Sequence, residues 1–180
     1  MNAALFSSSA FQAPMQALRQ HSTATAHIAR TLAERIGQPG DRVYLSGLLH
    51  DIGIAACLLV APDLMHPDAR PFEFEELAEP IHSVHEQAGE MLSSLWNMPA
   101  GLRWVFAHHH SFVLRTHASP MAALVCLASW IATEAGAGVI DRGERELATV
   151  AAKQFGWGGQ LADLVALGTG MVAELGRGEV

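Results

Sequence analysis

The segment VYLSGLLHDIGIAACLLV, residues 43–60, is the most apolar part of the 180-residue chain, and at its middle a histidine and an aspartate stand side by side, His50 and Asp51. An apolar run of this length predicts a helix that is buried on nearly all sides. Polar side chains inside such a helix are costly unless each finds a partner. The segment therefore predicts a central helix over residues 43–60 with a polar site built at His50 and Asp51.

The remainder of the chain also has the periodicity of helices. Apolar residues recur every three or four positions over residues 13–36, as on one face of an amphipathic helix, and Gly37-Gln38-Pro39-Gly40 ends that stretch. No stretch rich in Val, Ile and Thr alternates with a period of two, as a half-buried strand does. The pattern predicts an all-α, compact helical domain over residues 1–180. The other expected features are an N-cap at Asp41, a loop over 65–74, and a helix or short turn that begins over 73–77. Further helices are expected from Pro80 to about Trp96, from Pro99 to residues 108–110, over 120–135 and within 140–180.

Composition and charge exclude several classes of protein. The chain is 50% hydrophobic and 16% charged, which excludes a disordered chain, and its length suits one domain. Eleven Lys and Arg residues stand against eighteen Asp and Glu residues, with Lys153 as the single lysine. Such a chain has no basic stripe for a phosphate backbone, so we expect no non-specific nucleic-acid binding. No run approaches 18 apolar residues and the N-terminus has no basic region, so we expect no membrane association and a cytoplasmic location.

The ten histidines are gathered in groups rather than spread along the chain. His82 and His85 lie three residues apart, which places them on one face of a helix, and residues 108–110 are three histidines in a row. Grouped imidazoles are typical of metal sites. Each group alone is better explained as hydrogen-bonded core histidines, or as a surface run at a helix C-terminus where partial positive charge is favourable.

The order of the groups along the chain is more informative than any one of them. The segments QHSTATAHIARTLA, LSGLLHDIG, VHEQAGEMLSSLWNMP and VFAHHH occur in this order. Together they resemble the HDOD family of the HD superfamily of metal-dependent phosphohydrolases, over about residues 11–135. The resemblance implies an all-helical fold with a metal site at its centre.

Carried over position by position, the resemblance also implies a set of site residues. Asp51 is the candidate for a catalytic role, although none is assigned. In catalytic relatives such as the HD-GYP phosphodiesterases, a two-metal site activates a bridging water for phosphoester hydrolysis. The resemblance implies a divalent metal and favours iron or manganese over zinc. A domain that only binds a ligand can also lack a metal. The implied metal ligands are His21, His50, Asp51, His85, His109 and His110.

The sequence departs from the family's pattern at two places that bear on activity. The superfamily's last ligand is an aspartate, but the helix here reads CLASWIA and places Ser129 at that position. A serine hydroxyl is a poorer metal ligand than a carboxylate, so we expect at least one metal to be held more weakly. No GYP motif follows His110, so cleavage of cyclic di-GMP has no direct support. His82, Arg103, Arg115 and Ser129 are weaker candidates for contacts to a ligand.

Three functions are consistent with these residues. The first is a regulatory, signal-transducing HDOD domain that binds a small phosphorylated or nucleotide-like ligand or a signalling protein partner, with homodimerisation as a further possibility. The second is an active metal-dependent phosphohydrolase in which water or Glu86 compensates for Ser129. The third is a purely structural interaction domain. The missing aspartate disfavours the second, and the retained histidines disfavour the third, because buried histidines without a task cost desolvation.

Overall fold

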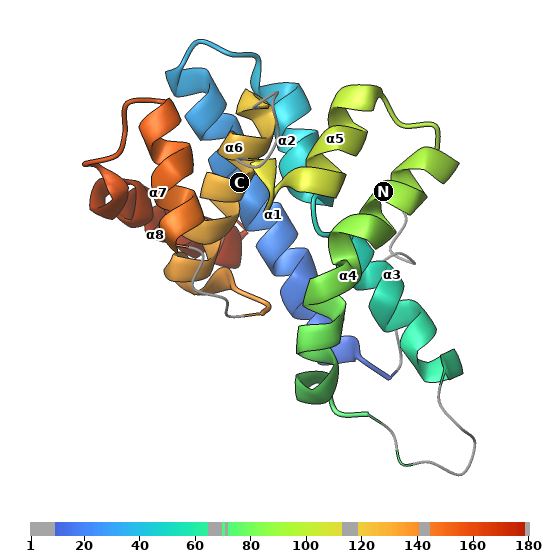
Figure 1. The fold of residues 1–180 in the computed structure, drawn as a ribbon. Coiled ribbons are helices and arrows are strands. Elements are labelled where there is room, and N and C mark those ends of the chain that lie inside the picture. Colours follow the sequence, from blue (N-terminus) through green and yellow to red (C-terminus); the bar gives the residue numbers. More distant parts are fainter. Residues whose placement is uncertain (1–9, 65–69, 71, 113–118, 141–144, 179–180) are drawn as a thin grey trace.

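The computed structural model describes residues 10–64, 70, 72–112, 119–140 and 145–178 (Figure 1). All regular elements within these ranges are helical, which confirms the predicted all-α fold. The helices are α1 (Gln12–Arg35), α2 (Gly40–Leu49), α3 (Ile52–Val60), η2 (Ala61–Leu64), α4 (Phe74–Leu95), α5 (Ala100–His108), α6 (Pro120–Ala132), η4 (Thr133–Ala137), α7 (Arg145–Gln154) and α8 (Leu161–Arg177).

Helix α1 runs through the middle of the molecule, with α7 and α8 on one side and α3 and α4 on the other (Figure 1). Its buried side chains belong to two apolar clusters. Leu18 packs in a cluster with α3 and α4, whereas Ala24 packs in a larger cluster with α2, α5, α6, α7 and α8. Leu49 belongs to the larger cluster, and Ile52 belongs to the cluster with α3 and α4. The polar residues between these positions, His21 and the His50–Asp51 pair, therefore lie where the two clusters meet.

The prediction of one helix over residues 43–60 is wrong at its middle, because the helix is interrupted there and two helices form, α2 and α3. Asp51 has φ −97° and ψ 19°, outside the helical region, and it forms the N-cap of α3. In an unbroken helix, neighbouring side chains point about 100° apart. The break lets the side chains of His50 and Asp51 approach each other. Asp41 is not the N-cap of α2 but lies in its first turn, since Pro39 occupies the cap position.

A helix or short turn is predicted to begin over residues 73–77 and a second helix at Pro80, whereas the structure has one helix, α4, which begins at Phe74 and contains the proline. A capping box starts it upstream: the carboxylate of Glu76 accepts a hydrogen bond from the backbone N–H of Glu73, and the side chain of Glu73 accepts one in return from the Glu76 backbone. Arg70 forms an ion pair with Glu76 and so supports the box. Helix α4 therefore extends for about three turns before it reaches His85.

Two helical stretches, Gly40–Leu64 and Pro120–Ala137, are long and apolar enough to cross a membrane by length and composition alone. In each, 61% of the scored window is buried inside the fold. This is the burial of core helices, which pass the same test in soluble proteins. The expected cytoplasmic location remains a prediction.

Candidate metal centre

The structure gathers the six residues that the resemblance implies as metal ligands into one buried cluster. His21 comes from α1, and His50 and Asp51 come from the turn between α2 and α3. His85 comes from α4, and the remaining two histidines follow α5 directly. His110 is half-buried, while the other five are at most 7% exposed. Side chains from four separate parts of the chain thus meet where the apolar clusters join.

The Asp51 carboxylate lies at the centre of the cluster, and its two oxygens face opposite sides. Oδ2 lies 3.1 Å from Nε2 of His50 and 3.5 Å from Nε2 of His21. Oδ1 lies 3.3 Å from Nε2 of His109 and 3.6 Å from Nε2 of His85. One carboxylate therefore joins two sets of imidazoles.

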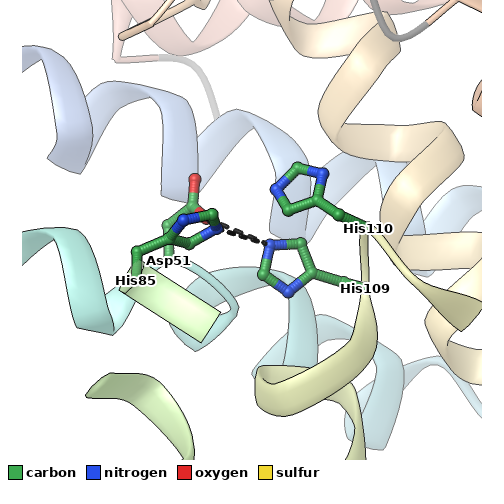
Figure 2. A group of neighbouring side chains, drawn as sticks. All are labelled: Asp51, His85, His109 and His110. Carbon is green, nitrogen blue, oxygen red and sulfur yellow. Dashed lines mark hydrogen bonds and ion pairs between the residues drawn. The ribbon is translucent and has the colours of Figure 1, made fainter. Parts of the chain in front are cut away.

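We name these sets by the residues whose ligand atoms lie within 4.8 Å of one another. The first ligand group is His21, His50 and Asp51. The second ligand group is Asp51, His85, His109 and His110. Figure 2 shows the second group, with Asp51 and the three imidazoles drawn together from α4, the α2–α3 turn and the end of α5.

Backbone carbonyls fix the orientation and the tautomer of the four fully enclosed imidazoles. A carbonyl oxygen only accepts hydrogen bonds, so an Nδ1 that contacts one carries the proton, and the neutral ring presents a lone pair at Nε2. Each Nε2 then faces the Asp51 carboxylate. The four pairs are His21 with Ala137 at 2.9 Å, His50 with Gly47 at 2.8 Å, His85 with His82 at 2.7 Å and His109 with Val105 at 3.1 Å.

This arrangement fits a divalent cation. The Nε2 atoms of His85 and His109 lie 3.4 Å apart, and both face Oδ1 of Asp51. When both nitrogens carry lone pairs, this contact is repulsive unless positive charge lies between them. Nε2 of His50 and Oδ1 of Asp51 are buried and have no hydrogen-bond partner within the described ranges. Ligating histidines in metal sites characteristically donate their second ring nitrogen to a carbonyl or carboxylate. The cluster is thus compatible with a metal site.

Protonation of three of these imidazoles is opposed by burial. Burial lowers the pKa of His21 to about 4, against attraction from Asp51. Burial likewise lowers the pKa of His85, and it holds the pKa of His109 well below its usual value. Burial alone would raise the pKa of Asp51, but the imidazoles around it, His50 foremost, hold that pKa well below its ordinary value. His21, His85 and His109 therefore offer neutral nitrogen donors near neutral pH, and Asp51 offers an ionised carboxylate.

Two glycines bring the helices close enough to assemble the cluster. A Cβ added at Gly53 would lie 1.9 Å from the carbonyl oxygen of His85, so only glycine lets α3 approach α4 there. A Cβ added at Gly47 would lie 3.0 Å from Cα of Ala26, where α2 crosses α1. These two positions flank the His50–Asp51 pair in sequence, so each holds one neighbouring helix against the site.

Ser129 lies beside the first ligand group, and it stands where the resemblance to the superfamily implies an aspartate. Its Oγ is 3.2 Å from Nε2 of His21, and the residue is 8% exposed. The hydroxyl can donate to the imidazole lone pair, which gives both atoms a partner without a cation. The first group and the neighbouring Ser129 together offer two imidazoles, a share of the Asp51 carboxylate and a hydroxyl.

The weaker ligand candidates are placed differently. His82 is half-buried, and its ring centroid lies 5.4 Å from that of His110, at the edge of the second group. Arg103 is exposed on α5 and does not belong to the buried cluster. Arg115 lies outside the described residues.

Two contributors were not predicted in these roles. The Ala137 carbonyl that orients His21 comes from η4, and no side-chain pattern identifies a backbone acceptor. The sequence suggests Glu86 as a substitute for the missing carboxylate beside Ser129. Its contacts instead lie with His109 and His110, where its carboxylate accepts from the His110 backbone N–H at 2.9 Å. The one sequence signal for this role is that Glu86 directly follows His85.

A helical domain built around a central histidine–aspartate cluster with two ligand groups belongs to the class that the HD superfamily represents. The model of the HDOD domain matches residues 1–112, and the chain belongs to that family. Searches of curated proteins and of solved structures return no significant match.

Proposed function

We propose that the chain is a regulatory HDOD domain that holds one divalent metal ion in the second ligand group and does not hydrolyse phosphoesters. The observation that carries this proposal is the hydroxyl of Ser129 at 3.2 Å from His21, where a carboxylate would complete the first group. Hydrolysis by a two-metal site needs both ions, since they share the activated water and the charge of the phosphate.

The two groups differ in how much negative charge and how many donors they offer an ion. The second group has three imidazoles and an oxygen of Asp51, which is a complete set of four protein ligands. The first group has two imidazoles, the other Asp51 oxygen and a neutral hydroxyl. Divalent cations bind carboxylates more strongly than hydroxyls, so the second group is expected to fill first and the first group weakly or not at all.

The surroundings of the second group favour an anionic ligand. When bound, a divalent metal would attract the oxygens of a phosphate or carboxylate. His110 and His82 are the half-buried members at this edge, so a ligand approaching from solvent meets them before the buried imidazoles. Their ring nitrogens can donate to phosphate oxygens. A small phosphorylated or nucleotide-like ligand fits this chemistry, and its binding is the event that a regulatory domain would transmit to a protein partner.

An active phosphohydrolase is the alternative that a specific observation favours. The Asp51 carboxylate presents one oxygen to each ligand group, which is the arrangement required to bridge two ions. If water replaced the missing carboxylate in the first group, two ions could be held despite Ser129.

Turnover of an aryl phosphodiester, with and without a chelator, separates the two functions. The wild-type protein, loaded in turn with iron, manganese and zinc, is expected to show no chelator-sensitive turnover. The Ser129→Asp variant restores the carboxylate and serves as the matched comparison. Chelator-sensitive turnover by the wild-type protein would refute the regulatory proposal and establish the phosphohydrolase.

A further inference from the structure

The carboxylate of Glu86 connects α4 to the paired histidines that follow α5. Its Oε1 accepts a hydrogen bond of 2.9 Å from the backbone N–H of His110 and lies 3.7 Å from Nδ1 of His109. The side chain is 23% exposed, so the contact is partly shielded from water. His85, the residue before it, belongs to the second ligand group. Consecutive residues of α4 therefore act on the same group, one as a ligand and the other on its neighbours.

The hydrogen bond to Glu86 occurs where α5 ends. In a continuing helix the His110 N–H would donate to the carbonyl four residues earlier, but α5 ends at His108 and this N–H is given to the Glu86 side chain. The segment AHHHSF has neither glycine nor proline to stop a helix. The side-chain acceptor from α4 thus marks the end of α5 and fixes the backbone of the paired histidines.

The position of that backbone determines whether both histidines reach one ion. Neighbouring side chains of a regular helix point about 100° apart. Here the ring centroids of His109 and His110 lie 4.1 Å apart, and a ligand atom from each falls within the second group. The negative charge of Glu86 also lies beside the Nδ1–H of His109, which strengthens the Nε2 donor of that ring.

We propose that Glu86 is a positioning residue of the metal centre, which sets the geometry of His109 and His110 and raises the donor strength of His109. The inference rests on the proposed metal site in the second ligand group. It assigns to Glu86 a task distinct from replacing the carboxylate that is missing at Ser129.

Binding of Co²⁺ alone to the full chain tests this role, because its visible absorption reports ligand geometry as well as affinity. Glu86→Ala is expected to weaken Co²⁺ binding by roughly 10–100-fold, the usual cost of losing a partner of a ligating histidine, and to change the spectrum. Glu86→Gln keeps an acceptor for the His110 N–H but loses the charge. It is expected to recover the wild-type spectrum and only part of the affinity.

Glu90→Ala is the matched control, since Glu90 is exposed on the same helix about one turn further on. It removes the same charge and is expected to leave affinity and spectrum unchanged. A Glu86→Ala variant that behaves like Glu90→Ala would overturn the proposal. If Glu86→Ala does not fold, a Glu86→Gln variant with wild-type affinity would overturn the effect of charge on His109. Failure of the wild-type chain to bind Co²⁺ would overturn the metal centre itself, a different result from binding that ignores Glu86.

Discussion

The first and second ligand groups share Asp51 but differ in their supports and in their access to solvent. His21 of the first group lies on α1 between the two apolar clusters, and η4 supplies the carbonyl that orients it. The second group depends on α4 and on the segment after α5, and it includes the half-buried His110. The first group has the hydroxyl of Ser129 beside it where the resemblance implies a carboxylate, whereas the second group has four residues that can each offer a ligand atom. The function we propose requires that metal binding and hydrolysis be separable in this fold, with the second ligand group binding an ion without the first.

Asp51→Asn is expected to have the largest effect, because it removes the one residue that both groups share. An amide is a weaker ligand than a carboxylate, because it is neutral and has only one oxygen to offer. Metal affinity should fall by more than the roughly 10–100-fold typical of an outer-shell partner. Titration with Mn²⁺ or Zn²⁺ measures this loss. Retention of wild-type affinity would show that Asp51 is not at the centre of the site.

Gly53→Ala is expected to break the second group while sparing the contacts of the first. The added methyl would lie 1.9 Å from the His85 carbonyl, so α3 and α4 must separate and move His85 away from Asp51. Overpacking of this kind costs about 1–3 kcal/mol of the free energy of unfolding, or more. Urea denaturation measures it.

Gly170→Ala is the control for that substitution, because a methyl at this position of α8 meets nothing within 4 Å. It should raise the free energy of unfolding by about 0.5–1 kcal/mol, the usual gain from alanine in a helix. Equal stability of the two variants would contradict the close approach of α3 and α4.

Acidification is expected to lower the free energy of unfolding of the metal-free protein. In the first ligand group, His21 contributes to this loss. Its pKa is lowered to about 4 in the folded chain from 6.5, so the unfolded chain binds more protons between these values. Stability is therefore full above pH 6.5 and is lost as the pH falls toward 4. From pH 7 to pH 5 the loss due to His21 is about 2 kcal/mol.

Denaturation of the wild-type protein and of the His21→Ala variant at pH 7 and pH 5 measures the loss of stability that is due to His21. The wild-type protein should lose more stability on acidification than the variant. The same loss in both would mean that His21 is not held neutral by burial.

Gly136→Ala is expected to have the smallest effect and to act on the first group alone. Gly136 has φ +90° and precedes Ala137, whose carbonyl orients His21, while a methyl at this position meets nothing within 4 Å. The cost is therefore backbone strain, about 1–2 kcal/mol. Gly156→Ala is matched in conformation, with φ +75° and open space, and lies between α7 and α8. In a Ser129→Asp background, only Gly136→Ala should weaken the first metal site, as titration would show.

The amphipathic helices were predictable from the sequence, because their apolar spacing records which face is buried. Residues 13–36 match α1 closely, and its glycine stop at Gly37 has φ +70°. The break at His50–Asp51 was not predictable from composition, since the run on both sides is apolar and has no proline there. The sequence divides α4 at Pro80, because a proline is a stronger signal than a capping box whose first member is a glutamate, Glu73.

That the six site residues meet in one cluster was predictable only from the order of their motifs along the chain. Spacing placed His85 on a helix and Asp51 next to His50, but no local pattern showed that one carboxylate would face both ligand groups. The backbone acceptors that fix the histidine tautomers, such as the Ala137 carbonyl, depend on tertiary contacts that a sequence does not display. The side-chain acceptor at Glu86 depends on the crossing of α4 and the end of α5 in the same way.

Elemental analysis of the protein purified without a chelating step, compared with its Ser129→Asp variant, tests the central claim most directly. The account predicts one metal ion per wild-type chain, held by the second ligand group, and two per chain once the carboxylate is restored beside His21. Two ions in the wild-type chain would contradict the claim that Ser129 disables the first group. No metal in either protein, even after reconstitution with iron, manganese and zinc, would contradict the metal centre itself.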